Sequence, residues 1–160
     1  MSWRRVANLP GAHWGFVLKP RQVGIKKVYI AGGPMAVSSE AEAETRAIVC
    51  PRNPADPNCV QRHAGADRYG TSVAIAAHHF PSATNFVAAT GVNWPDSIAA
   101  GPFAARRGAP ILLSETDNFD EIPSRYMVSK LAPGNRGWVV GGPAAVGAAA
   151  EWDFRSVLPK

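Results

Sequence analysis

The sequence lacks the features that mark a membrane protein or a secretory precursor. Its 160 residues contain no apolar run of about eighteen residues, the length that a membrane-spanning helix needs. The first thirty residues also lack the short apolar core of a signal peptide. We therefore predict no membrane contact, and any export must rely on sequence outside this chain.

Motifs for phosphate, metal and nucleophilic chemistry are missing as well. The Gly-Gly-Pro turns at 32–34 and 141–143 are followed neither by the lysine of a P-loop nor by the third glycine of a dinucleotide site. Ser97 lies in no G-x-S-x-G elbow. His78 and His79 are adjacent on an expected helix, so they cannot share a face and bind one metal. We predict no cofactor and no metal.

Cysteine is scarce, and its two positions are informative. Cys50 and Cys59 bracket a loop that is too rich in proline to be a helix or a strand. No second cysteine pair lies near them, which argues against zinc. The pattern favours a disulfide formed in an oxidising compartment. Two unpaired cytosolic thiols are the alternative.

Acidic residues are absent from the start of the chain, and this absence accounts for its basic character. Residues 1–30 hold six basic and no acidic residues, whereas the rest of the chain holds 11 basic and 12 acidic ones. A basic tail can bind a polyanion, but it is more often simply solvated. We expect 1–24 to be an irregular basic segment, and we predict no nucleic-acid partner.

What the sequence does contain is an internal repeat. The segment YIAGGPMAV at 29–37 returns as WVVGGPAAV at 138–146, at a constant offset of 109 residues. An element that recurs at the length of one domain indicates a tandem unit. We expect 25–59 to be the end of a preceding unit together with the cysteine loop, and 60–160 to be one full module.

Short apolar segments alternate with helical patterns from residue 25 onward. Strands are expected at 27–31, 85–90, 110–114 and 136–141, and helices at 38–49, 67–80, 95–107, 120–131 and 144–154. Ser39 and Glu42 have the spacing of a capping box for the first helix. This order predicts an α/β fold with a mostly parallel sheet flanked by helices, in a Rossmann-like or Toprim-like three-layer arrangement.

Two polar segments carry the residue types of a binding site. The first, RHAGADRYGT, holds Arg62, Asp67, Arg68 and Tyr69. Asp67 is also placed to cap the helix that follows, and capping is the plainer role. A buried arginine needs a carboxylate or carbonyl partner, which this loop or Asp96 can supply.

The second polar segment, TGVNWPDS, follows the expected strand 85–90 and opens the next helix. Ligands of open α/β sheets gather at the carboxyl ends of strands, so this loop is the best positional candidate for a site. Trp94 offers a flat face to a sugar ring, and Asn93 and Asp96 can bond its hydroxyl groups. An acid/base pair of Asp67 and Asp96 is an alternative, because glycoside hydrolysis uses two carboxylates.

Four sequence blocks follow one another along the chain. They are Arg62-x-x-Gly65-x-Asp67-Arg68-Tyr69-x-Thr71, Ala89-Thr90-Gly91-x-Asn93-Trp94-Pro95-Asp96, Gly108-Ala109-Pro110-Ile111-Leu112-Leu113 and Val139-Val140-Gly141-Gly142-Pro143-x-Ala145-Val146. Together they resemble the cell wall-binding repeat 2 family, whose modules hold surface proteins on the walls of Gram-positive bacteria. The resemblance covers about residues 60–154, with the end of a preceding repeat before it.

The resemblance implies attachment without catalysis to an anionic wall polysaccharide, and an extracellular, wall-bound location. It implies α/β modules that are normally present in three copies and pack as a triangle, whereas this chain holds one full unit and a fraction. It also implies polymer contact through the polar loops near module junctions and through Pro110, Ile111, Leu112 and Leu113.

Three hypotheses follow, each from a different functional class. The favoured one is a wall-binding module without catalysis, carried by the four blocks. The second is a small α/β hydrolase that acts on wall glycan or peptidoglycan through Asp67 and Asp96. The third is a structural unit that associates with neighbouring repeats or with copies of itself, motivated by the internal repeat and by the small residues of 95–107.

Overall fold

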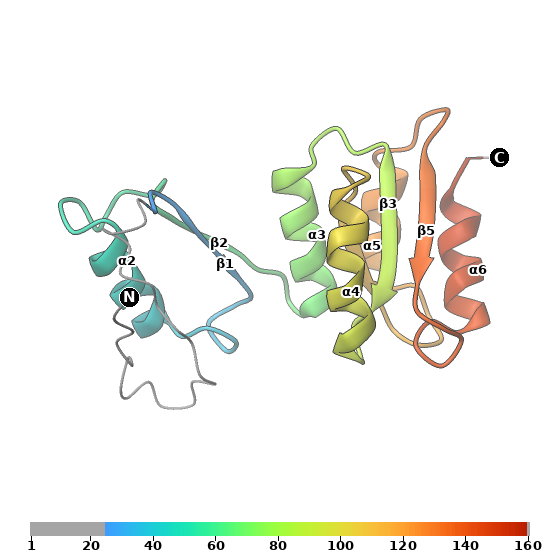
Figure 1. The fold of residues 1–160 in the computed structure, drawn as a ribbon, viewed down its shortest axis with the longest axis horizontal. Helices are drawn as coiled ribbons and strands as arrows, with labels where there is room; N and C mark the ends of the chain where they lie inside the picture. The colour runs from blue at the N-terminus through green and yellow to red at the C-terminus, as the bar shows by residue number, and fades with distance from the viewer. Residues whose placement is uncertain (1–24, 160) are drawn as a thin grey trace. The chain divides into compact units, whose positions relative to one another are not determined.

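The computed structural model describes residues 25–159, which form two compact units that divide between His63 and Ala64 (Figure 1). The expected irregular basic segment 1–24 lies outside the described residues. Among residues 25–159, no helix is both long and apolar enough to cross a membrane.

The first unit is a strand, a helix and a second strand. These elements are β1 (Val28–Ala31), α2 (Ser39–Val49) and β2 (Val60–His63), and the two strands pair in parallel. The helix begins after Ser38, whose Oγ accepts a hydrogen bond from the Ala41 N–H at 3.2 Å. The prediction that Ser39 caps this helix was therefore wrong by one residue.

A small core and a disulfide hold the first unit together. Ile30, Cys59 and Val60 are buried, and Val49 packs against them. The disulfide between Cys50 and Cys59 closes the loop that joins α2 to β2. Their Cα atoms are 6.3 Å apart, within the usual range for a disulfide. The bond suits an oxidising compartment.

The second unit contains a three-stranded parallel sheet. Its elements are α3 (Arg68–His79), β3 (Asn85–Thr90), α4 (Trp94–Ala105), β4 (Ile111–Ser114), α5 (Glu121–Val128), β5 (Arg136–Val140) and α6 (Ala148–Val157). The strands lie in the order β4-β3-β5. The predicted α/β class and parallel sheet are confirmed.

Helices cover both faces of this sheet, and the central strand β3 therefore has side chains buried on both sides. Phe86 and Ala88 join a core that is completed by residues of α3, α5 and α6. Val87 and Ala89 face the opposite way and pack against the alanines of α4. Figure 1 shows α4 in front of the sheet and α5 behind it. The small side chains of α4 let it lie close to the strands.

The strand β2 was not predicted from the sequence, which shows Arg62 and His63 only as the start of a polar segment. Val60 is buried, but the three residues after it are polar, so no apolar pattern marks the strand. It forms because its backbone pairs with β1, in the register Val28 with Val60. The expected start of a repeat at residue 60 stays a prediction.

Candidate functional site

The first predicted site segment forms the start of α3. The Asp67 Oδ1 accepts a hydrogen bond from the Gly70 N–H at 2.7 Å, so this carboxylate caps the helix. The Thr71 Oγ1 accepts another from the Gly65 N–H at 3.1 Å. A side chain at position 65 would overlap the backbone of Gly70, which explains the glycine. Asp67 therefore has a structural role here.

Arg68 and Tyr69 lie against the carboxyl ends of β3 and β4. The Arg68 guanidinium donates a hydrogen bond to the Gly91 carbonyl at 2.5 Å. A Cβ atom built on Gly91 would lie 2.8 Å from the Tyr69 ring and 3.4 Å from Leu113, so these residues are closely packed. Burial, and next the charge of Glu115, raise the pKa of the Tyr69 hydroxyl.

The second predicted segment lies at the same end of the sheet. A Cβ atom on Gly141 would come within 3.1 Å of the Asp96 Oδ2, so the first turn of α4 meets the end of β5. The Ser97 Oγ donates a hydrogen bond to the Thr90 carbonyl. Asn93 is the N-cap of α4, but its side chain makes no capping bond. Trp94 is 71% exposed.

The structure thus brings six of the predicted residues together at the carboxyl end of the sheet, namely Asp67, Arg68, Tyr69, Asn93, Trp94 and Asp96. Arg62 is not among them, because it lies on β2 in the first unit.

Arg62 is held by residues of its own unit. Its Nε donates to the Glu42 Oε2 at 2.8 Å, and its guanidinium also donates to the Gly32 carbonyl at 2.6 Å. Glu42 accepts from Arg46 as well, and the two arginines, Arg46 first, lower the pKa of this carboxyl group. The expected partner within the loop or at Asp96 was wrong, because the partner is 20 residues earlier in the chain.

The predicted segment Pro110 to Leu113 lies mainly inside the molecule. Pro110 and Leu112 are fully buried, and Leu112 belongs to the core on the α3, α5 and α6 face. Ile111 is half-buried and packs on the opposite, α4 face, and Leu113 is half-buried too. Only Ile111 and Leu113 in this segment retain some solvent exposure, so the predicted polymer contact depends on these two side chains.

The charges of the second unit are sorted between the two ends of its sheet. The segments at the carboxyl end, 64–69, 91–97, 115–121 and 141–147, hold six acidic residues and one arginine. The segments at the amino end hold four basic residues and no acid. The basic residues are Arg106, Arg107, Lys130 and Arg136.

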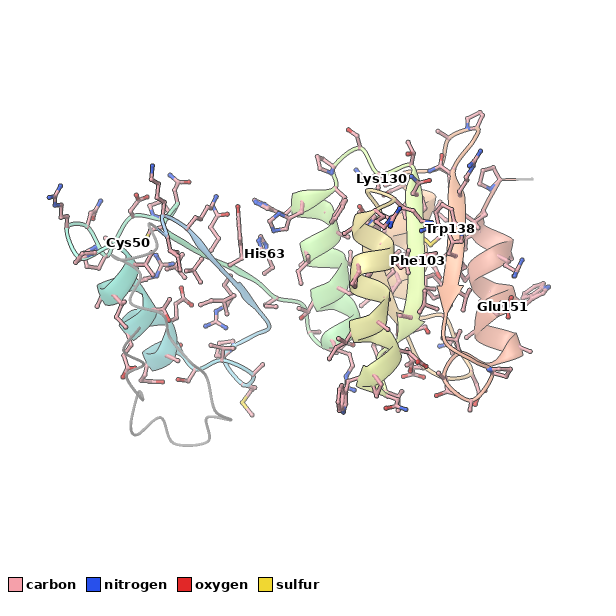
Figure 2. The ribbon with its side chains drawn as sticks, in the orientation of Figure 1. Cys50, His63, Phe103, Lys130, Trp138 and Glu151 are labelled. Carbon is pink, nitrogen blue, oxygen red and sulfur yellow. A yellow bond between two sulfur atoms is a disulfide. The ribbon has the colours of Figure 1, made fainter. Side chains whose placement is uncertain are left out.

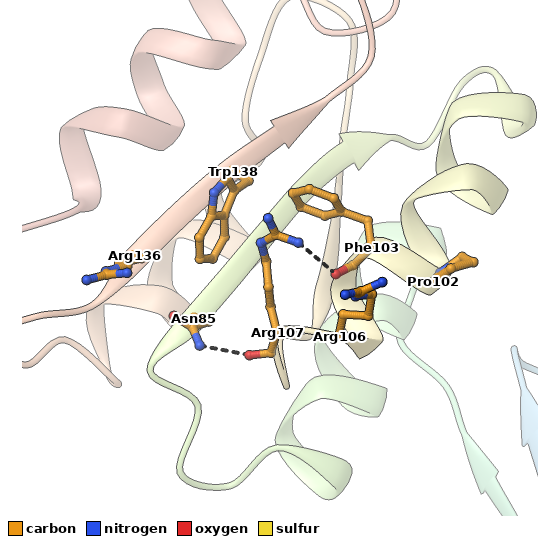
Figure 3. A pocket seen from close by; sticks show the side chains of 7 residues that line it. All are labelled: Asn85, Pro102, Phe103, Arg106, Arg107, Arg136 and Trp138. Atoms are coloured by element: carbon orange, nitrogen blue, oxygen red, sulfur yellow. Dashed lines mark hydrogen bonds between the residues drawn. The ribbon is translucent and has the colours of Figure 1, made fainter.

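Three of these basic residues line a cavity of about 720 Å³ on the α4 side of the amino end. Figure 3 shows the seven lining residues, which are Asn85, Pro102, Phe103, Arg106, Arg107, Arg136 and Trp138. They come from the end of α4, the loop after it and the first residues of β3 and β5. Figure 2 places Phe103, Trp138 and Lys130 in this half of the unit.

Arg107 is the centre of the cavity. Its guanidinium carbon lies 3.6 Å from the centroid of the Phe103 ring and 4.9 Å from that of Trp138. Its NH1 donates to the Phe103 carbonyl at 3.4 Å, and its own carbonyl accepts from the Asn85 Nδ2 at 2.8 Å. The two rings meet edge to face at 6.1 Å. The guanidinium therefore lies close to both aromatic rings, at distances typical of cation–π contacts.

The cavity arginines have no acidic partner among residues 25–159. The salt bridges among residues 25–159 involve Arg46, Arg62, Arg125 and Arg155. Arg106, Arg107 and Arg136 are in none of them. Guanidinium groups beside half-buried aromatic rings such as these can bind a carboxylate or phosphate through paired hydrogen bonds while a sugar ring stacks nearby.

Sequence reasoning missed this cavity, although a signal was present. The net charge of the module is near zero, so its basic residues drew no attention. In a parallel sheet, however, all loops that lead from helix to strand lie at one end; Arg106 and Arg107 lie in one such loop, and Arg136 directly follows another. Summing charge over those loops alone would have revealed the basic end.

Helices on both faces of a parallel sheet, and a Gly-Gly-Pro turn that occurs twice, define the chain as a repeat module of the α/β class. It belongs to the cell wall binding domain 2 (CWB2) family, whose model matches residues 62–151. The predicted family is confirmed. The protein is a cell wall-binding module, and the family places it in the cell wall or at the cell surface.

Individual relatives are larger proteins. N-acetylmuramoyl-L-alanine amidase LytC of Bacillus subtilis is 37% identical over 60 residues, which are 38% of this chain and 12% of LytC. Cwp8 from Clostridium difficile is 23% identical, with a TM-score of 0.64 over 84% of this chain and 21% of Cwp8. Cwp6 from the same organism is 19% identical, with a TM-score of 0.67 over 83% of this chain and 20% of Cwp6. At these identities the two structures show the fold alone.

Proposed function

We propose that this module holds an anionic wall polysaccharide without catalysis, and that the polymer binds in the cavity of Arg106, Arg107 and Arg136. The observation that carries this proposal is the set of three arginines in one cavity that lack any acidic partner among the described residues. An anionic polymer supplies the missing counter-charges.

The shape of the cavity suits a charged sugar better than a bare ion. Trp138 and Phe103 expose aromatic surface beside the guanidinium of Arg107. A pyranose ring can pack on such surface while its carboxylate or phosphate substituent reaches the arginines. Asn85 adds an amide that can bond a hydroxyl group.

The carboxyl end of the sheet is less suited to the same polymer. Its acids outnumber its single arginine by six to one, and Arg68 is already bonded to the Gly91 carbonyl. Bringing like charges together costs free energy. The residues predicted from sequence at this end, including Trp94 and Asn93, remain the competing location for the site.

The absence of catalysis in this proposal is supported by the use of the candidate carboxylates. Asp67 is engaged as the cap of α3, and Asp96 lies against the turn at Gly141. Neither lies in the basic cavity. The amidase activity named for LytC belongs to a protein of which this chain covers 12%. One shallow site binds weakly, so firm retention on a wall requires several modules acting together.

The test is retention of purified Gram-positive walls by beads that carry the chain at high density, because dense display supplies multivalency. Intact walls are compared with walls from which anionic polymer has been extracted, over a rising salt series. We expect retention on intact walls at low salt, and its loss after extraction or at high salt, because salt screens exposed charge.

The decisive variant replaces Arg106, Arg107 and Arg136 by alanine, and we expect it to lose retention at low salt. The matched control replaces Arg125 and Arg155, which pair with glutamates on their own helices, and it should bind as the parent does. All these chains keep the basic segment 1–24, so any binding by that segment is common to them. Equal retention by both variants would refute this location, and no retention by the parent would refute the function.

A further inference from the structure

The two Gly-Gly-Pro segments have the same local structure. The glycine that follows each strand, Gly32 or Gly141, has a positive φ, of 107° and 127°. The turn is then closed by a hydrogen bond from the Val37 N–H to the Gly33 carbonyl at 3.0 Å, and by its counterpart from Val146 at 3.0 Å. A helix follows, α2 in the first copy and α6 in the second.

An ion pair is also common to the two copies. In α2, Arg46 bonds Glu42 at 2.8 Å. In α6, Arg155 bonds Glu151 at 2.6 Å. Both residues are shifted by the same 109 positions as the turns. The second copy therefore repeats the first from strand to helix, side chains included.

In the first copy a third element is docked on the strand. β2 pairs in parallel along β1, and three side-chain bonds fix it there. The Arg62 guanidinium donates to Glu42 and to the Gly32 carbonyl, and Arg46 donates to the Val60 carbonyl at 2.7 Å. The ion pair between Glu42 and Arg46 thus takes part in the side-chain bonds that hold the neighbouring strand.

In the second copy the same edge of the strand is open. β5 is the outer strand of the order β4-β3-β5, and no strand among the described residues pairs with its outer side. The Arg136 N–H donates to the Thr84 carbonyl, on the β3 side. Because backbone groups alternate along a strand, the groups of Gly137, Val139 and Gly141 point to the outer side.

These three residues correspond to the ones that hold β2 in the first copy. Their counterparts at the 109-residue offset are Val28, Ile30 and Gly32. The N–H groups of Val28 and Gly32 donate to carbonyls at the two ends of β2, at 2.9 and 2.8 Å. The open edge of β5 is therefore the edge that β1 uses.

In the second copy Glu151 and Arg155, the counterparts of Glu42 and Arg46, line a cavity. A cavity of about 300 Å³ lies along β5 and α6, and its walls include Gly137, Val139, Gly141, Glu151 and Arg155. The Glu151 side chain is 39% exposed and that of Arg155 69%, against 21% and 23% for the Glu42 and Arg46 side chains. The ion pair is therefore more exposed in the second copy, where no strand of residues 25–159 pairs beside it, than in the first, where β2 does.

We infer that the outer edge of β5 is a docking edge for the first strand of another wall-binding repeat, a segment of the β2 type. Such a strand adds to the sheet in parallel, through backbone hydrogen bonds. In the register of the first copy, its counterparts of Val60, Gln61, Arg62 and His63 lie opposite Gly137, Trp138, Val139 and Val140. Its arginine bonds Glu151 and the Gly141 carbonyl. This inference does not depend on the polymer.

The test appends a copy of residues 50–66 to the full chain after Leu158, in place of 159–160. Leu158 is the counterpart of Val49, so the copy resumes the path that leads from α2 to β2. We expect amide hydrogen exchange at Gly137, Val139 and Gly141, followed by NMR, to slow by about tenfold or more. The thermal midpoint of the chain should rise with it.

Two matched controls make the result specific. The first is the same extension with proline at the copies of Gln61 and His63, because proline has no N–H to give to a ladder. The second compares Glu151→Gln with Glu121→Gln in the extended chain. Glu121 forms the same kind of pair with Arg125, at 2.5 Å, but lies on α5. We expect Glu151→Gln, and not Glu121→Gln, to remove most of the protection.

Unchanged exchange at the three glycine and valine amides, or equal protection by the proline extension, would overturn the inference. If the extended chain does not fold, a synthetic peptide of residues 57–66 is titrated into the unextended chain to millimolar concentration. Amide shifts confined to 137–141 and absent with the proline peptide support the docking edge. No shifts at all refute it.

Discussion

The amino and carboxyl ends of the sheet in the second unit carry opposite charge, and they use it differently. At the carboxyl end, where the helices begin, Asp67 and Asp120 bond the backbone N–H groups of Gly70 and Ile122. At the amino end, where the helices finish, three arginines of one cavity have no acidic partner among the described residues. Two of the six acids are thus engaged as helix caps, whereas the three arginines have no carboxylate partner within residues 25–159.

Helix polarity explains why the charges are sorted in the first place. Acids stabilise the positive end of a helix dipole and bases the negative end, so a β/α unit gathers acids at one edge of its sheet and bases at the other. Capping then satisfies Asp67 and Asp120, because a carboxylate can accept from exposed N–H groups. Arg106 and Arg107 follow α4, where the helix dipole favours them, but they form no salt bridge within residues 25–159. The comparison teaches that a net charge near zero can conceal a strongly basic surface.

The largest expected effect is a loss of stability at the carboxyl end. Gly65→Ala places a Cβ atom against the backbone of Gly70 and Thr71, which cannot move aside cheaply. We expect the free energy of unfolding to fall by about 3 kcal/mol, as overpacking does. Thermal unfolding measures it. The control is Gly142→Ala at the same end, where nothing lies within 4 Å, and which should have little effect. Equal midpoints for the two variants would contradict the close packing.

The next effect in size is a loss of binding at the amino end. Arg107→Lys keeps the positive charge but removes the flat guanidinium that lies 3.6 Å from the Phe103 ring. We expect affinity for isolated wall polymer to fall by about tenfold, which is about 1.4 kcal/mol. Calorimetry at low salt measures it. The control is Arg68→Lys at the acidic end. If Arg68→Lys weakens binding more, the polymer lies at the carboxyl end instead.

A smaller effect is expected from the helix cap. Asp67→Ala removes the acceptor of the Gly70 N–H and should cost about 1 kcal/mol. For a unit of this size the thermal midpoint should fall by roughly 4–8 °C. The control is Asp117→Ala, because Asp117 makes no hydrogen bond within residues 25–159. Wall retention well below the midpoint should be unchanged. A loss of retention with intact folding would restore Asp67 as a ligand-binding residue.

Much of the fold was predictable because its strands are strongly apolar. β3 was predicted at its observed bounds, since all but its first residue are buried. β2 was not, because Gln61, Arg62 and His63 are polar and the strand depends on pairing with β1. The start of α6 was placed too early, because the turn after Gly142 occupies the residues up to Gly147.

The candidate site was predictable only in part, for a reason of topology. Asp67 and Asp96 were linked in the sequence only as an alternative acid/base pair, and the structure places both, with Arg68, at the carboxyl end of the sheet. The partner of Arg62 was beyond sequence reasoning, since Glu42 approaches it only after β1, α2 and β2 have folded together. The cavity was missed because Arg106 and Arg107 are separated from Arg136 by about 30 positions and form no motif with it.

The smallest expected effect falls on Trp94, the residue that sequence alone made the best stacking platform. Its side chain is 71% exposed at the start of α4, so Trp94→Ala removes little packing and should change stability by about 0.5 kcal/mol or less. It lies at the acidic end, so affinity for an anionic polymer should also hold. The matched change is Trp138→Ala in the basic cavity, which should weaken binding, and titration of each variant with the same polymer compares them. If Trp94→Ala weakens binding and Trp138→Ala does not, the sugar stacks at the carboxyl end despite its charge, and the contrast between the two ends reduces to one of helix capping.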